Sequence, residues 1–198
     1  MLRGMDLVAE RADLVVELAL QEHRRVVRDV DGSPDVLRYY HEGLRWGWQR
    51  SYRNRHDQWC GAFAAYCWGR GGLLPDIRLY DLASTGRLQR WAYDTPRWHR
   101  PQDTRPGDIL LLGGEDGPSH IGLAVTGCVL GRISTVEGNS VGTLGDGTRG
   151  EGVVTHDRTI SGPYRVHAAI RPFEVDLEAA LPLSTPPAAP PASSQRSS

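Results

Sequence analysis

The sequence contains no lysine, so all 23 of its basic residues are arginines, and 24 acidic residues nearly balance them. The formal net charge is −1 at pH 7. Proteins that bind nucleic acid through its phosphates need an excess of positive charge, which this composition does not supply. The sequence therefore predicts no nucleic-acid partner.

Long apolar segments are also missing. The N-terminal stretch MLRGMDLVAERADLVVELAL is interrupted by charged residues, among them Asp6, Glu10 and Asp13. It therefore fits neither a membrane span nor the apolar region of a cleaved signal peptide. We expect synthesis in the cytosol and no membrane insertion. Action in the periplasm or outside the cell would then follow lysis, or export without a signal peptide.

Cysteine is scarce, with only Cys60, Cys67 and Cys128 in the chain. An odd number of cysteines cannot pair completely, and their spacing fits no zinc or disulfide framework. At least one thiol is therefore free for chemistry. No cofactor and no metal site are expected.

The length of 198 residues suits one domain with a tail. We assign residues 1–175 to the domain and expect it to be a monomer. The segment 182–198, PLSTPPAAPPASSQRSS, has too few large apolar residues to form a core. It is expected to be a disordered tail.

Helical patterns come first along the chain, and strand patterns follow. Apolar residues recur at helical steps over 7–28, a second helix can run from Pro34 to about Gly43, and a third from about Gln58 to Gly69. Short runs rich in β-branched residues, bounded by glycine or proline, begin with 109–112 and continue to the end of the domain. This order indicates an α+β fold, with N-terminal helices packed on an antiparallel β-sheet.

Cys60 lies in the first turn of the third expected helix, three residues after Asp57, a residue type that caps helices. The reactive form of cysteine is the thiolate, and a helix N-terminus favours negative charge. Cys67 lies two turns later, so Cys67 and Cys128 are interpreted as core residues. A buried structural role is the alternative for Cys60 as well.

A cysteine nucleophile needs a base within hydrogen-bond reach and a residue that orients that base. Of seven histidines, His120 has the most distinctive position, at the start of the strand HIGLAV and after the turn EDGPS. The next strand contains VEGN, whose Glu137 and Asn139 would share one face. In one register of the hairpin Asn139 lies opposite His120, whereas a slip by one residue turns both polar side chains to the other face.

The segments WCGAFAAYCW, RPGDILLL, SHIGLAV and VEGNS together resemble the CHAP domain. This family of cysteine- and histidine-dependent amidohydrolases/peptidases belongs to the papain-like superfamily and is related to NlpC-type cell-wall peptidases. The resemblance covers about residues 8–173. It implies a papain-like fold, the nucleophile at Cys60, the catalytic histidine at His120, and orienting residues at Glu137 and Asn139.

The resemblance further implies hydrolysis of an amide bond in bacterial peptidoglycan, either between N-acetylmuramic acid and L-alanine or within the peptides. The backbone N–H of Cys60, and as a second candidate the side chain of Gln58, would then stabilise the oxyanion. The sequence shows neither the aspartate-rich calcium loop of some members nor a recognisable wall-binding domain. The sequence is compatible with three biological settings: a phage lysin, a toxin that needs a delivery machinery and an immunity protein, or a partner-dependent enzyme.

Two alternative functions use the same residues. A papain-like thiol hydrolase could cleave or deamidate a protein in a target cell. A catalytically silent module could keep the fold only to bind the cell wall, although the presence of all four polar positions argues for an enzyme.

Overall fold

The computed structural model describes residues 2–30, 33–44, 58–73 and 79–172. The expected tail, 182–198, lies outside these residues. Within the described ranges, no helix combines the length and apolar character that crossing a membrane requires. The helices are α1 (Leu2–Arg24), α2 (Pro34–Arg38), the π-helical turn η1 (Tyr39–Gly43), α3 (Cys60–Arg70), α4 (Leu79–Leu82) and α5 (Thr85–Asp94).

The second half of the chain forms one six-stranded sheet with the order β1-β6-β2-β3-β4-β5. Every neighbouring pair of strands is antiparallel. The prediction of an α+β fold with an antiparallel sheet is therefore confirmed. The strands, with one short 3₁₀ turn after the first, are β1 (Trp98–His99), η2 (Pro101–Asp103), β2 (Ile109–Gly114), β3 (Gly117–Ala124), β4 (Arg132–Thr143), β5 (Arg149–Thr159) and β6 (Arg165–Ile170).

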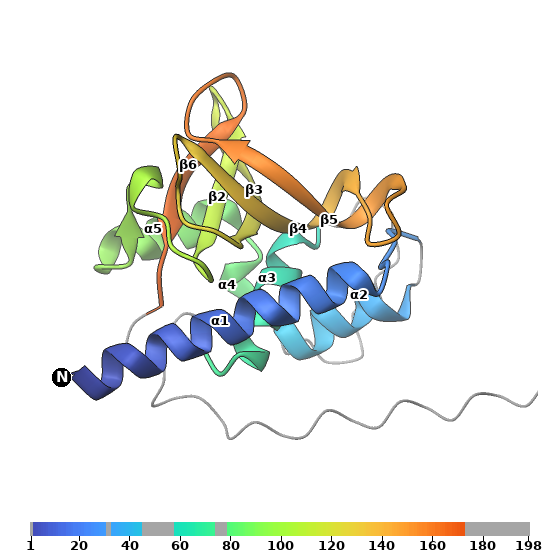
Figure 1. Ribbon diagram of the computed structural model, residues 1–198, viewed down its shortest axis with the longest axis horizontal. Coiled ribbons are helices and arrows are strands. Elements are labelled where there is room, and N and C mark those ends of the chain that lie inside the picture. The colour runs from blue at the N-terminus through green and yellow to red at the C-terminus, as the bar shows by residue number, and fades with distance from the viewer. Residues whose placement is uncertain (1, 31–32, 45–57, 74–78, 173–198) are drawn as a thin grey trace, which may run out of the picture.

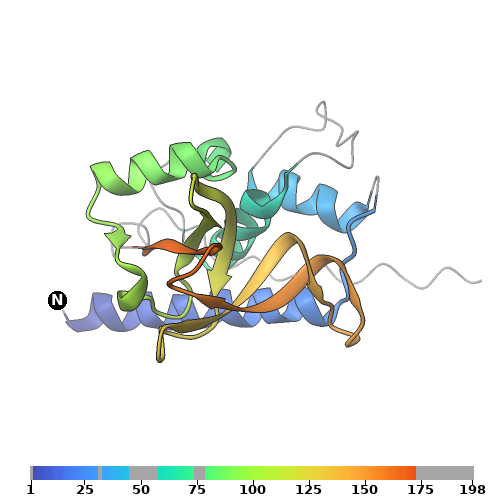
Figure 2. The same ribbon diagram turned by 90° about the horizontal axis from the view of Figure 1, so that it is seen from above.

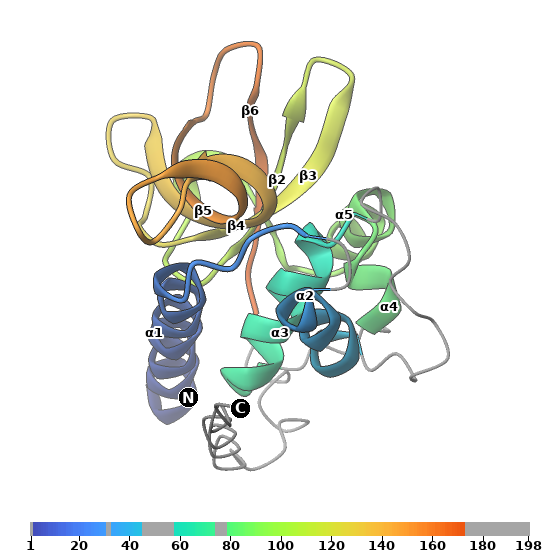
Figure 3. The ribbon, with the colours of Figure 1, turned by 90° about the vertical axis from the view of Figure 1, so that its right-hand side faces the viewer.

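The helices gather on one side of the sheet (Figure 1), and α3 lies in the middle of this layer, between α1 and α5 (Figures 2 and 3). Neighbouring residues of a strand point to opposite faces. Strand β2 therefore contributes Ile109 and Leu111 to the core shared with the helices, and Leu110 and Leu112 to a second, smaller core on the other face. Strand β2 is thus buried on both faces.

Helix α3 begins later than the sequence pattern predicts. Its N-cap residue is Trp59, which makes no side-chain capping hydrogen bond, so Gln58 precedes the helix. Asp57, the expected cap, lies outside the described residues. The helix ends at glycines, as expected: Gly72 has a φ of +78°, the left-handed conformation that glycine adopts most easily.

The sequence patterns do not reveal α4, α5 or β1. A signal for α5 is present but short. The Ser84 side chain accepts a hydrogen bond from the Arg87 backbone N–H at 3.4 Å, which caps the helix. Its buried residues are Leu88 and Ala92, one turn apart. Trp91, which packs against the same core, completes the i, i+3, i+4 spacing, so the helical signal is present but spans only about one turn.

Small residues let α3 pack closely on α4. A Cβ atom at Gly61 would lie 2.5 Å from the Ala83 Cα and 2.6 Å from the Leu82 carbonyl oxygen. We expect Gly61→Ala to lower the free energy of unfolding by about 1–3 kcal/mol, the usual cost of overpacking. Gly86→Ala in α5 is the matched control, since no described atom lies within 4 Å of its added Cβ. Urea unfolding measures the free energy of unfolding of both variants. Equal values for the two variants would contradict the close packing.

Candidate active site

Three elements bring Cys60, His120 and Glu137 together. Cys60 is the first residue of α3, His120 lies in β3, and Glu137 lies in the neighbouring strand β4. The His120 Nε2 is 3.0 Å from the Glu137 Oε2. The Cys60 thiol lies close enough to the His120 ring to help raise the pKa of that ring. Because Nε2 faces the carboxylate, Nδ1 is the ring nitrogen left for the sulfur.

The cluster is shielded from water. Cys60 is 2% exposed, the side chain of His120 is 12% exposed, and the Glu137 side chain is fully buried. Charges interact more strongly in such surroundings than in bulk water. The protonation states of His120 and Glu137 therefore depend strongly on each other.

Glu137 accepts hydrogen bonds on both carboxylate oxygens. Arg158 of β5 donates two of them, from Nε to Oε1 at 2.7 Å and from Nη2 to Oε2 at 2.6 Å. The hydroxyls of Thr135 and Ser140 donate to Oε1 at 2.7 Å and to Oε2 at 3.3 Å. With His120 added, these donors saturate the lone pairs of the carboxylate and fix its orientation.

The shifted pKa values describe an ion pair at this site. Burial alone would raise the pKa of Glu137, but the hydrogen bonds from Arg158 and His120 outweigh it and hold this pKa well below its ordinary value. Burial alone would lower the pKa of His120, but the hydrogen bonds with Cys60 and Glu137 outweigh it and raise this pKa to about 9. The carboxylate and the imidazolium therefore coexist at neutral pH.

The elevated pKa of His120 predicts a titration midpoint of about 9 in the folded protein, against an ordinary value of 6.5. Protonation of His120 thus stabilises the fold below pH 6.5, and this contribution disappears as the pH rises through about 9. Cys60→Ser should lower the midpoint, because the interaction with the sulfur is the largest one that favours the charged ring. NMR of the imidazole C–H protons measures the His120 midpoint in the unsubstituted protein and in Cys60→Ser. A midpoint of 6.5 in the unsubstituted protein would contradict the ion pair.

The β3–β4 hairpin adopts the register that would place Asn139 opposite His120, since its two observed pairs are Leu123–Val136 and Ala124–Thr135. The β3–β4 ladder contains only these two pairs. Farther along β4, its pairing with β5 is irregular.

The β3–β4 ladder ends before it reaches His120 and Asn139. The pairing of β4 with β5 is irregular between Glu137 and Ser140, and Asn139 has a φ of +56°. A left-handed residue interrupts the alternation of faces along a strand. The observed register agrees with the predicted one, but the pairing of Asn139 with His120 itself stays a prediction, and Glu137 is the residue that contacts the imidazole.

The backbone N–H of Cys60 lies next to the thiol in the first turn of α3. The first N–H groups of a helix have no carbonyl partner within it; here the helical hydrogen bonds begin with the Phe63 N–H and the Trp59 carbonyl at 3.0 Å. The Cys60 N–H therefore precedes the first helical hydrogen bond, and its role as an oxyanion donor stays a prediction. Gln58 is exposed two residues earlier, and its role in the oxyanion site stays a prediction.

The residues that surround Glu137 on β5 were not foreseen. The His156 Nε2 is 4.0 Å from the Glu137 Oε2 and 3.1 Å from the Ser140 Oγ. The ring of Tyr164 faces Arg158, with its centroid 5.0 Å from the guanidinium carbon. In the segment GVVTHDRTI, His156 and Arg158 are two residues apart and so share a face. That pattern alone does not reveal which residue of β4 they meet.

The comparisons with protein-family models, curated proteins and solved structures find no match for this chain. Within the described part of the chain, no group of three or more His, Cys, Asp or Glu residues is placed to hold a metal ion. The candidate site is therefore defined by its own geometry.

Proposed function

We propose that the protein is a cysteine amidohydrolase of the papain-like, CHAP type that cleaves an amide bond in bacterial peptidoglycan. The observation that carries this proposal is the hydrogen bond between His120 and the buried Glu137, with the Cys60 thiol beside the same imidazole and at the start of a helix. A helix N-terminus favours a thiolate, and a buried carboxylate favours an imidazolium. The antiparallel sheet packed against the helix that carries the cysteine supports a papain-like fold.

The reaction would proceed through a thioester. The Cys60 thiolate adds to the amide carbonyl, and the Cys60 N–H stabilises the oxyanion. As the C–N bond breaks, His120 gives its proton to the leaving amine. Water then attacks the thioester while His120 accepts a proton from it, and the acid product and the thiolate are released. Glu137 keeps the imidazole oriented through both steps.

Peptidoglycan is proposed as the substrate because the segments that carry the site resemble those of a wall-hydrolase family. SHIGLAV and VEGNS supply His120 and Glu137, and WCGAFAAYCW supplies Cys60. The scissile bond would lie between N-acetylmuramic acid and L-alanine, or within the stem peptide or cross-bridge.

Release of soluble dye from dye-labelled peptidoglycan tests the proposal, with walls of several chemotypes under reducing conditions. We expect release by the unsubstituted protein and none by Cys60→Ala. The absence of release from every chemotype would contradict the wall substrate and favour a thiol hydrolase that acts on proteins. Equal sedimentation of both proteins with the wall, without release, would instead support a silent binding module.

A further inference from the structure

The fully buried Glu137 carboxylate depends on neighbouring positive charge. A buried carboxylate without such compensation takes up a proton instead. Two cationic side chains contact it: His120 from β3 at 3.0 Å, and Arg158 from β5 through two hydrogen bonds of 2.7 and 2.6 Å. The guanidinium stays charged at every pH at which proteins are folded, whereas the imidazole does not. Arg158 is therefore the permanent counter-charge.

The charges balance only when Arg158 is present. A Cys60 thiolate, a His120 imidazolium, a Glu137 carboxylate and the Arg158 guanidinium together carry no net charge. Removal of the guanidinium leaves one negative charge in excess within a site that water hardly reaches. Such a coupled cluster takes up a proton, either on the Cys60 sulfur or on the Glu137 carboxylate. Either event removes one of the two negative charges that face the His120 imidazolium.

The other groups that face Glu137 do not replace this charge. Thr135 and Ser140 of β4 are neutral donors. Burial keeps the pKa of His156 in β5 below its ordinary value, so this ring is neutral at pH 7. Tyr164, which precedes β6, covers the face of the Arg158 guanidinium.

We infer that Arg158 is a positioning residue of this site, which keeps Glu137 ionised and oriented so that His120 can activate Cys60. The inference rests on the proposed cysteine chemistry. It assigns a role to a residue that neither the sequence pattern nor the family resemblance singles out.

The pH dependence of Cys60 alkylation by iodoacetamide tests this role without any substrate. Peptide mass spectrometry separates the modification of Cys60 from that of Cys67 and Cys128. We expect Arg158→Met, which removes the charge, to move the midpoint of the alkylation profile upward by about one pH unit or more. Added guanidinium ion should reverse part of this shift. Arg158→Lys, which keeps the charge without the two-point contact, should give an intermediate profile.

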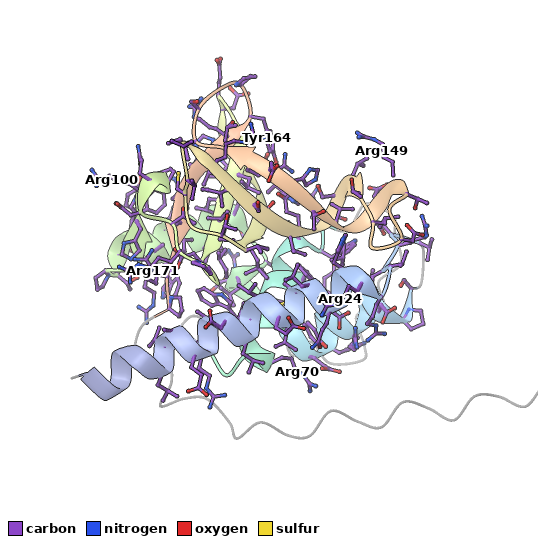
Figure 4. All side chains as sticks on the ribbon, in the orientation of Figure 1. Arg24, Arg70, Arg100, Arg149, Tyr164 and Arg171 are labelled. Carbon is purple, nitrogen blue, oxygen red and sulfur yellow. The ribbon has the colours of Figure 1, made fainter. Side chains whose placement is uncertain are left out.

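Arg171→Met is the matched control. Arg171 makes the same kind of two-point contact with the buried Asp108, at 3.1 and 2.8 Å. Figure 4 shows Arg171 well apart from Tyr164, the residue that covers Arg158. Both methionine variants lose a buried ion pair, so both should lower Tm, by on the order of 10 °C. Only Arg158→Met should change the alkylation profile.

An unchanged profile in folded Arg158→Met, with a loss of Tm like that of Arg171→Met, would overturn the inference and leave Arg158 a structural role. If Arg158→Met does not fold, an unchanged profile in Arg158→Lys would overturn it instead. Failure of the proposed function looks different. In that case the unsubstituted protein would release nothing from peptidoglycan, while the alkylation profiles of the Arg158 variants could still differ from that of the unsubstituted protein.

Discussion

Replacement of Cys60 by serine is expected to lower kcat/KM for amide hydrolysis by at least about 1,000-fold. Serine is similar in size and can still hydrogen-bond to His120, so the fold should persist. Its hydroxyl, however, does not ionise beside an imidazolium at neutral pH. The rate at which new amino termini appear in digested peptidoglycan measures the loss.

Cys128→Ser is the matched control for this substitution. Cys128 is partly buried and packs against the second core, on the face of the sheet away from the helices. We expect its replacement to change activity by less than about two-fold, as for substitutions away from a site. Full activity of Cys60→Ser, or equal loss in both variants, would contradict the assignment of the nucleophile.

Replacement of His120 by alanine is expected to lower the rate by about 100- to 10,000-fold, the usual contribution of a general acid and base. The pH profile carries a second expectation. Because the pKa of His120 is raised to about 9, the unsubstituted protein should lose the proposed activity as the pH rises through this value. Above it the ring no longer holds the proton that the leaving amine needs. His120→Ala should lack this alkaline limb in its residual activity.

His167→Ala is the corresponding control, since His167 is half-buried in β6 and its Nε2 lies 3.0 Å from the Gly114 carbonyl oxygen. It should retain both the activity and the alkaline limb. An alkaline limb that survives in His120→Ala would show that another group titrates, and would contradict the proposed role of His120.

The elements that carry Cys60 and His120 could be predicted from sequence because each has a strong local signal. Small residues followed by glycines mark α3, and a turn followed by β-branched residues marks β3. The hairpin between β3 and β4 is also local, so the sequence leaves only two registers, which differ by one residue and turn the polar side chains to opposite faces. The contact between Glu137 and the imidazole could be expected from the family resemblance and not from the register, which pairs Asn139 with His120.

Arg158 and Asn139 show why the rest of the site could not be predicted. Arg158 reaches Glu137 across the β4–β5 ladder, and nothing in the sequence around Arg158 specifies that partner. The left-handed Asn139 has a different cause. A Cβ atom at Gly138 would lie 2.5 Å from a ring carbon of Trp59, so β4 passes very close to the start of α3 within its irregular stretch. Tertiary packing of this kind leaves no trace in an alternating pattern.

Digestion of purified peptidoglycan in H₂¹⁸O, followed by mass spectrometry of the fragments, tests the central claim most directly. We predict that the unsubstituted protein creates new amino termini and new carboxyl groups that carry one ¹⁸O atom, and that Cys60→Ser creates neither. The new termini would also identify the bond, because an amidase frees the amino group of L-alanine and an endopeptidase frees one inside the peptide. Fragments without ¹⁸O at a carboxyl group, or identical fragments from both proteins, would contradict hydrolysis by Cys60.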